Sequence, residues 1–254
     1  MASVLLQTRL GGPDTGKLRC ATFNVLADAY LGYGDYSHVD PALLVPGARL
    51  DALVRQVNGP LLGGVDIIGL QEADRSLVEA FEDDERWQTL WSPKRRNKPD
   101  GCLTLVKNNV EIADYNSFSY NDESGHVFQI VQIGHVAIAN THLKWASADD
   151  PRHIGVSQAR ELLDILTNQP IAVILADCND RPGGPVRSLV EGAGFKNVSA
   201  DKPTAVVNKE LVALDLLAVR GLSAHWVDTN YDLNSIPNEA CPSDHIPLVA
   251  DLEQ

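Results

Sequence analysis

Polar side chains with catalytic potential follow one apolar segment after another along this chain. A lone carboxylate after a strand usually caps a helix or closes a turn, so one such case would carry little meaning. Here eight residues take this position: Asn24, Glu72, His142, Asp177, Asn179, Asp215, Asp244 and His245. In α/β folds, ligands collect at one end of the strands. The pattern therefore predicts that these side chains share a single cleft.

The last of these residues raise the question of a nucleophilic triad, because Ser243, Asp244 and His245 are consecutive. A triad needs three side chains that converge on one point, usually from separate loops. Neighbouring side chains of an extended segment point to opposite faces. We therefore interpret Ser243 as a turn or cap residue and not as a nucleophile.

The remaining residue types favour phosphate chemistry. Asp177 and Asn179 are two apart, so in an extended segment both would face one side and could hold a water and a phosphoryl oxygen. Oxygen ligands such as Glu72 and Asp244 suit magnesium, whereas the thiolate and histidine clusters of zinc sites are missing from the sequence. Magnesium would polarise a phosphate, a carboxylate would orient water, and a histidine would stabilise the phosphorane. This combination predicts a phosphoesterase.

Short apolar segments bounded by Gly, Pro, Asn or Asp predict the buried strands that must position these residues. They are residues 18–26, 65–72, 102–107, 127–133, 136–143, 171–179, 213–219 and 245–252. Helical spacing of apolar residues occurs in 46–62, 157–168 and 183–194. The segments 102–107, 127–133 and 136–143 follow one another with no helical pattern, as in an antiparallel meander. This order predicts a mixed α/β protein of two packed sheets with outer helices.

The composition is that of an ordinary globular protein with an acidic surface. The 254 residues are 44% hydrophobic and carry a formal net charge of −13, which opposes indiscriminate binding along a nucleic-acid duplex. Four widely spaced cysteines, Cys20, Cys102, Cys178 and Cys241, predict buried, reduced thiols in a cytoplasmic protein. The sequence has no signal-peptide pattern and no apolar run near ~18 residues, so we expect no membrane partner.

The ordered motifs of the chain resemble the endonuclease/exonuclease/phosphatase superfamily. Within it, they look most like the branch of deadenylases, nocturnin, Angel proteins and the mitochondrial 2′-phosphodiesterase. The motifs are FNVLADAY, GLQEAD, KPDGCLTLVK, ANTHLKW, LADCNDRP, ALDLLAV and CPSDHIPLVADL. The resemblance implies a four-layer α/β sandwich of the DNase I type, with two mixed β-sheets face to face and helices on both outer sides. It also implies an N-terminal extension, residues 1–17, and a single catalytic domain, residues 18–254.

The resemblance implies a metal site. Glu72 matches the principal magnesium ligand of the family, and Asn24 and Asp244 match residues that help to hold the ion directly or through water. The expected cofactor is Mg²⁺, for which Mn²⁺ can substitute.

The resemblance also implies catalytic roles. Asp177 matches the residue that orients the attacking water, and Asn179 matches a contact to the phosphate and the metal-bound waters. His142 and His245 match phosphate-binding histidines, the second of which can also act as acid or base. Asp215 matches the carboxylate that pairs with the last histidine and fixes its tautomer.

Two departures from the family pattern stand out. Ala176 and Cys178 flank the aspartate where Gly and Phe or Leu are common, and we expect no loss of activity from these small or buried types. Nocturnin-like proteins carry an arginine soon after the THLK run. Trp145 and Ala146 stand there instead, so recognition of an extra phosphate by that arginine does not carry over.

Cationic residues near the motifs are candidates for substrate binding. The segment 94–98 carries four positive charges just before the PDGC motif, and Arg96 and Lys98 could guide a nucleotide or RNA strand, or form a solvated loop. Lys144 lies two residues past a motif histidine, so it would face the same side and could touch phosphate. Trp145 could stack on a base or pack at the rim.

Together these features predict a Mg²⁺-dependent phosphoesterase. The leading form hydrolyses a nucleotide or RNA phosphodiester, like a 3′-exoribonuclease or phosphodiesterase, by in-line attack of water. One rival is a phosphatase of a small phosphorylated nucleotide or RNA end. Another is a catalytically inactive scaffold, which the complete set of motif residues opposes. The expected partner is a nucleotide or single-stranded RNA, and no stable protein partner is predicted.

Overall fold

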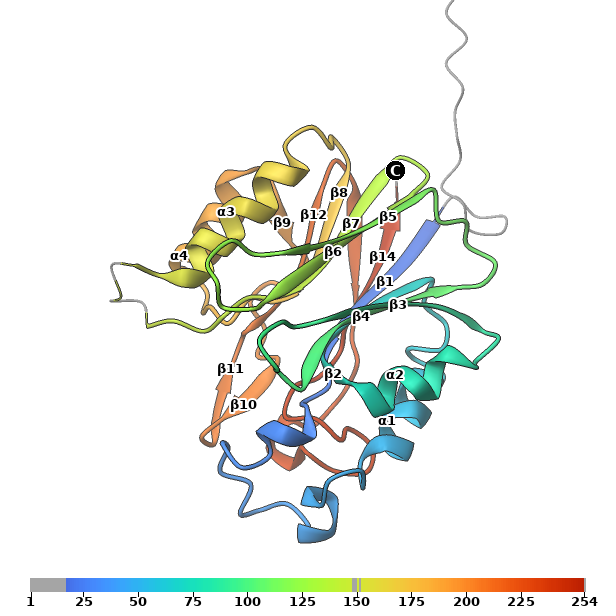
Figure 1. The fold of residues 1–254 in the computed structure, drawn as a ribbon, viewed down its shortest axis with the longest axis vertical. Coiled ribbons are helices and arrows are strands. Elements are labelled where there is room, and N and C mark those ends of the chain that lie inside the picture. Colours follow the sequence, from blue (N-terminus) through green and yellow to red (C-terminus); the bar gives the residue numbers. More distant parts are fainter. Residues whose placement is uncertain (1–16, 148–149, 151, 254) are drawn as a thin grey trace, which may run out of the picture.

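Two six-stranded mixed β-sheets form the centre of the molecule (Figure 1). The computed structural model describes residues 17–147, 150 and 152–253. The first sheet has the order β13-β14-β1-β2-β4-β3, with β1 Lys17–Asn24, β2 Ile67–Asp74, β3 Trp87–Pro93, β4 Asp100–Lys107, β13 Ser223–Val227 and β14 Leu248–Glu253. The second has the order β5-β6-β7-β8-β12-β9, with β5 Asp114–Ser119, β6 Val127–Ile133, β7 Val136–His142, β8 Ala172–Asp177, β9 Lys196–Asn197 and β12 Asp215–Arg220.

Helices cover the outer face of each sheet. They are α1 Leu50–Val57, α2 Arg75–Glu82, α3 Ile154–Leu166 and α4 Pro185–Gly192. A separate hairpin consists of β10 Ala205–Val207 and β11 Glu210–Val212, and short 3-10 turns span Asp28–Tyr30, Pro41–Leu44 and Leu233–Ser235. In Figure 1, α1 and α2 lie beside the first sheet and α3 and α4 beside the second, on opposite sides of the molecule.

The alternation of side chains along the strands builds these layers. Because successive residues of a strand face opposite sides, β1 sends Leu18 and Cys20 into the core between the sheets and Ala21 and Phe23 toward α1 and α2. The inner core also contains Leu217 of the second sheet, whose other face packs on α3 and α4. The four-layer α/β sandwich is thereby confirmed. Each of the four cysteines is free and buried, as expected.

Several elements differ from the expectation. The predicted helices are present as α1, α3 and α4, and β6 and β7 pair antiparallel as expected. Residues 102–107 do not join them in a meander, because β4 pairs with β2 and β3 in the first sheet. The neighbour of β6 is instead β5, an edge strand whose polar sequence lacks the apolar pattern of a buried strand. Helix α2 and strand β3 were likewise not anticipated.

The first strand begins one residue earlier than the expected domain boundary. Lys17 pairs with Glu253 of β14 and belongs to β1, so the expected extension overlaps the domain by one residue. Residues 1–16 lie outside the described residues. Within the described segments, none of the helices combines the length and apolarity needed to span a bilayer.

Strand direction brings the polar strand ends to one edge. β1 and β2 are parallel in the first sheet, and β7 and β8 are parallel in the second, so each pair ends at one edge. β12 runs antiparallel to β8, and its first residue, Asp215, therefore stands opposite Asp177, the last residue of β8. The loop before β14 reaches the same edge, because β14 is antiparallel to β1.

A buried polar network joins the two sheets beneath this edge. Gln71 Nε2 of β2 donates to Asn140 Oδ1 of β7 at 2.8 Å, and Asn140 Nδ2 donates to Thr104 Oγ1 of β4 at 3.0 Å. A Cβ atom at Gly69 would lie 2.9 Å from Asn140 Oδ1, so this position of β2 requires glycine. Since buried polar groups are costly unless they are paired, the network favours one register of sheet on sheet.

Candidate active site

Glu72 lies at an irregularity within β2 and not at its end. The pairing of β2 with β4 shifts between Leu70 and Ala73, and Glu72 has a φ of 56°, a left-handed conformation that is uncommon for a residue with a side chain. Glu72 Oε2 accepts a hydrogen bond from the Ala27 N–H at 3.0 Å. Such bulges re-aim a side chain next to active sites, and this one directs the carboxylate to the edge where the other strand ends meet.

Asn24 connects the two sheets across the site. Its Nδ2 donates to Glu72 Oε1 at 3.0 Å and to Asp177 Oδ2 at 2.8 Å. Its Oδ1 accepts from the Leu26 N–H at 2.9 Å, and Leu26 also has a positive φ of 57°. The amide thus holds a carboxylate of each sheet at a fixed separation.

The Asp177–Asn179 segment differs from the extended pair expected from the sequence. β8 ends at Asp177, and Asn179 takes a left-handed φ of 49°, so the chain turns back. The Asn179 N–H donates to Asp177 Oδ1 at 2.9 Å, and Asn179 Nδ2 donates to Leu143 O at 2.9 Å. The same Nδ2 lies 2.9 Å from His142 Nε2. The turn, and not a shared strand face, brings aspartate and asparagine together.

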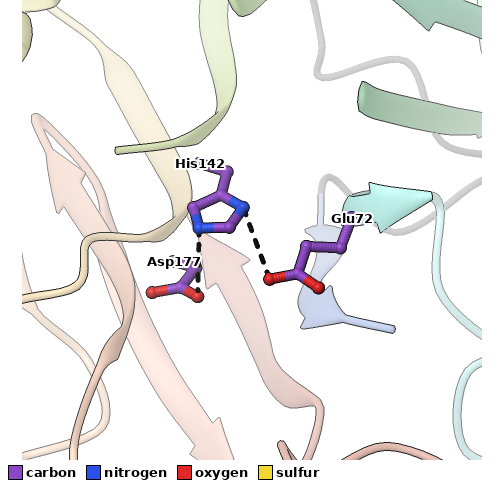
Figure 2. Close-up of side chains that lie close together, drawn as sticks. All are labelled: Glu72, His142 and Asp177. Atoms are coloured by element: carbon purple, nitrogen blue, oxygen red, sulfur yellow. Dashed lines mark ion pairs between the residues drawn. The ribbon is translucent and has the colours of Figure 1, made fainter. Parts of the chain in front are cut away.

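His142 lies between two carboxylates that come from different sheets (Figure 2). Its Nε2 is 3.7 Å from Asp177 Oδ2, and its Nδ1 is 3.8 Å from Glu72 Oε1. Burial first, and the nearby ammonium of Lys94 second, hold the pKa of His142 well below its usual value. This histidine is therefore neutral at physiological pH.

His245 has the opposite electrostatic character. Burial opposes its charge, but Asp215 Oδ2 at 2.8 Å from Nδ1 raises the pKa of His245 well above its usual value. The other ring nitrogen, Nε2, lies 3.9 Å from Asp177 Oδ2. Burial and the charge of Asp215 raise the pKa of Asp177, although His245 acts against this shift. A neutral and a cationic imidazole thus flank one carboxylate, an arrangement suited to acid–base chemistry.

The loop before β14 places Asp244 beside Tyr36, in a cavity that Glu72 and His245 also line. Asp244 Oδ2 accepts from the Tyr36 hydroxyl at 2.8 Å, while the buried Oδ1 has no hydrogen-bond partner among the described residues. Ser243 Oγ donates to the main-chain oxygen of Asn24 at 2.7 Å and accepts from the His245 N–H at 3.2 Å. Ser243 therefore seats the loop, as its interpretation as a cap residue predicts.

These oxygen atoms fit a hard divalent cation. Glu72, His142 and Asp177 each offer an atom within 4.8 Å of the others, and Asp244 Oδ1 accepts no hydrogen bond from the described residues, with His245 Nε2 4.0 Å away. Burial also raises the pKa of Glu72, although the charge of Lys94 opposes the shift, so a bound cation would further stabilise the charged form. Carboxylates without thiolates are the ligands that magnesium prefers. Glu72 and Asp244 would hold the ion, and Asn24 would orient Glu72.

Two buried residues of the site escaped the sequence analysis as functional groups. Lys94 is almost fully buried, and its Nζ lies 2.5 Å from Asp100 Oδ2 and 3.3 Å from His142 Nδ1. Asp100 also accepts from the Tyr30 hydroxyl at 2.8 Å. Both residues were visible in the cationic segment and the PDGC motif. A sequence pattern does not reveal which cation of a polar loop turns inward.

Of the residues expected to bind substrate, Lys98 lies near the site and Arg96 does not. Lys98 is partly buried, and burial, followed by the neighbouring charge of Lys94, lowers its pKa, with Lys144 contributing in the same direction. The charges of Lys94 and Lys98 also contribute to the lowered pKa of His142, which associates these two lysines with the His142 side of the site. Arg96 is exposed, pairs with Glu123 at 3.2 Å and lines a separate hollow, so it is not brought to the catalytic residues.

Comparison with solved structures shows which known proteins share this fold. No curated protein matches the chain by sequence. The fold is similar to that of ANGEL2, a 2′,3′-cyclic phosphatase, with a TM-score of 0.77 and 16% identity over 93% of this chain and 95% of that one. It is also similar to the human nocturnin catalytic domain with bound sulfate, with a TM-score of 0.68 and 18% identity over 93% and 94% of the two chains. For D. rerio TDP2 complexed with a single-stranded DNA product, the TM-score is 0.65 with 14% identity over 94% and 100%.

ANGEL2 and nocturnin come from the branch that the sequence motifs resemble. The family model with the description Endonuclease/Exonuclease/phosphatase family matches residues 21–245, a span that runs from β1 to the last motif histidine. The chain therefore belongs to the endonuclease/exonuclease/phosphatase family of metal-dependent enzymes that hydrolyse phosphate ester bonds.

Proposed function

We propose that this protein hydrolyses a nucleotide or RNA phosphodiester with Mg²⁺, or Mn²⁺ in its place, by in-line attack of water. The observation that carries the proposal is the pair of differently charged histidines on either side of Asp177, with the carboxylates of Glu72 and Asp244 nearby. This arrangement supplies a base, a positive charge and oxygen ligands within one cleft. The family membership supports the reaction class.

The residues of the chain divide the work of hydrolysis. Asp177, whose raised pKa makes it a better proton acceptor, orients a water molecule and takes its proton. The water oxygen forms a bond to phosphorus, and the ester oxygen leaves with the bonding pair and is protonated from solvent. His245, charged through Asp215, stabilises the negative charge that grows on the phosphoryl oxygens. When bound, magnesium would polarise the phosphate and stabilise the leaving oxygen.

Neutral His142 and Asn179 complete the phosphate site. The Asn179 turn holds its amide 2.9 Å from His142 Nε2, which limits rotation of the imidazole. Lys94 lies on the other side of the same ring. We assign His142 and Asn179 to binding and orienting the phosphate. Lys98 and Lys144 would provide further cationic contacts.

A phosphatase of a small nucleotide or RNA end is the second candidate. A cavity of about 220 Å³ opens beside Glu72, Asp244 and His245. Pockets for whole drug-sized ligands span about 300–1,000 Å³, so this cavity favours a small group over a long strand. The similarity to ANGEL2, which has also been seen in complex with adenosine-2′,3′-vanadate, points the same way.

One assay separates these forms. The protein is incubated with Mg²⁺ and oligo(A), with a nucleoside 2′,3′-cyclic phosphate, and with a panel of phosphomonoesters. Release of nucleoside monophosphate from oligo(A) identifies the exonuclease. Opening of the cyclic ester identifies an RNA-end phosphodiesterase, and release of free phosphate identifies the monoesterase. Equal turnover in a chelator, or in Glu72→Ala, would contradict the proposed mechanism.

A further inference from the structure

The cavity beside the catalytic residues has walls that take no part in hydrolysis. One wall is the loop after β1, residues 30–38, and the other is the β10–β11 hairpin, from which residues 206–209 line the space. Glu72, Asp244 and His245 form its inner end. A part of the substrate that occupies the cavity would therefore lie next to the phosphate ester at the catalytic residues.

Both walls are attached to the same catalytic-loop residue. Tyr36 of the loop donates its hydroxyl hydrogen to Asp244 Oδ2 at 2.8 Å. The Val206 N–H of the hairpin donates to the main-chain oxygen of Asp244 at 2.9 Å, and Ala205 forms an isolated bridge with His245. The two walls are thus fixed relative to the reacting phosphate, as a specific binding site requires.

The loop wall is aromatic. Tyr30 and Tyr36 point their hydroxyl groups at Asp100 and Asp244, and both hydroxyls are thereby occupied. Tyr33 lies against Tyr30 with ring centroids 6.1 Å apart, and it remains 84% exposed. A Cβ atom at Gly34 would come within 2.5 Å of the Tyr36 ring, so the loop closes on this ring only with glycine there. An exposed aromatic ring beside a phosphate site is a platform on which a nucleobase can stack.

The hairpin wall supplies an apolar surface and polar groups. Val206 and Val207 face the cavity, and Asn208 and Lys209 have φ values of 50° and 68°, as in a tight hairpin turn. Lys209 Nζ forms an ion pair with Asp35 Oδ2 at 2.9 Å. This pair joins the hairpin to the aromatic loop, and both residues line the cavity.

We propose that this cavity binds the base and sugar of a single nucleoside next to the scissile phosphate. The base stacks on Tyr33 and its edge bonds to Asn208, between the loop and the hairpin that the Asp35–Lys209 pair joins. The inference rests on the proposed function for the position of the phosphate, but the binding of the base is measured separately from turnover.

The experiment measures binding in a variant that cannot hydrolyse. In the Glu72→Gln background, calorimetry compares adenosine monophosphate with ribose 5-phosphate, which has the phosphate and sugar without a base. We expect the nucleotide to bind at least tenfold more tightly. Adding Tyr33→Ala should weaken the nucleotide about tenfold and leave ribose 5-phosphate unchanged, while Tyr33→Phe, which keeps the ring, should retain affinity.

Two comparisons make the result decisive. Leu211→Ala is the matched control, because Leu211 is a 44% exposed side chain of the same hairpin that does not line the cavity. Equal affinity for the two ligands, or loss of affinity with Trp145→Ala in place of Tyr33→Ala, overturns the proposal. If the base preference is found but the wild-type protein hydrolyses no ester, the proposed function fails and the nucleoside site stands.

Discussion

Asp215 Oδ2 lies 2.8 Å from His245 Nδ1, and both side chains are buried. Asp215 begins β12 of the second sheet, whereas His245 belongs to the loop before β14 of the first. This hydrogen bond therefore spans the sandwich and fixes which ring nitrogen faces Asp177. It also supplies the negative charge that keeps a buried imidazole protonated.

Replacing Asp215 by Asn removes the negative charge next to His245 but leaves a side chain that can still form a hydrogen bond with its Nδ1. The amide occupies the same space, but burial then lowers the pKa of His245 with only the more distant carboxylates of Asp177 and Asp244 to oppose it. We expect kcat/KM to fall about 10²-fold or more, and the alkaline limb of the pH profile to move to lower pH. A pH–rate profile of both proteins tests this. An unchanged alkaline limb would show that His245 acts uncharged.

Removing the Glu72 carboxylate should abolish activity without lowering the stability of the metal-free protein. Burial raises the pKa of Glu72 although the charge of Lys94 and the amide of Asn24 oppose the shift, so its carboxylate is held at a cost in the absence of a bound cation. In a chelator, Glu72→Gln should therefore unfold at the same or a higher temperature than the wild type. Added Mg²⁺ should raise the Tm of the wild type only. Thermal unfolding with and without Mg²⁺ measures both effects, and an equal Mg²⁺ shift in the variant would exclude Glu72 as a ligand.

Arg49 holds together the loops that lie beside Glu72. Its buried guanidinium donates to Val25 O at 3.1 Å, to Pro242 O at 2.6 Å, to the oxygen of Leu26, and to Asp28 Oδ1 at 2.7 Å. Arg49→Ala should lower the free energy of unfolding by about 3 kcal/mol or more, because several carbonyls and a carboxylate lose their donor.

An exposed arginine provides the control for this variant. Arg75 pairs with Glu79 and Glu82 on the surface of α2, and Arg75→Ala should leave the free energy of unfolding nearly unchanged. Urea unfolding of both variants makes the comparison. Similar losses in the two would mean that the buried contacts of Arg49 do not support the site loops.

His126 should make the folded protein sensitive to acid. Burial, assisted by the charge of Lys94, lowers the pKa of His126 to about 4 from 6.5, and its Nδ1 lies 2.8 Å from the oxygen of His142. Below pH 6.5, His126 becomes protonated in the unfolded chain, whereas in the folded protein it stays neutral until about pH 4. The stability of the neutral form is thus complete above pH 6.5 and is lost as pH falls toward 4, by about 3 kcal/mol in total.

His126→Gln isolates this contribution, since glutamine does not titrate and its amide can donate to the same oxygen. The wild type should lose stability more steeply than the variant between pH 6.5 and 4. The two should run parallel above pH 7, which urea unfolding at several pH values measures. Parallel curves over the whole range would assign the acid sensitivity to other groups, such as His142.

Much of the molecule was determined by local sequence. The buried strands, three of the four helices and the identity of the motif residues followed from apolar periodicity and from the order of short motifs. Ser243 was correctly separated from a nucleophilic role, because consecutive residues of an extended chain cannot converge. These features depend on a few neighbouring residues, so the sequence alone contains them.

The tertiary structure decided the partners, the charges and the exact turns. Strand β4 joined the first sheet because strand pairing is set by hydrogen bonds between distant segments. Asn179 reached the site through a left-handed turn, and Lys94 turned inward to Asp100. The opposite pKa shifts of His142 and His245 depend on burial and on neighbours far along the chain, which no local pattern specifies. The sequence thus named the candidate site residues, and only packing set the direction in which the pKa of each histidine shifts.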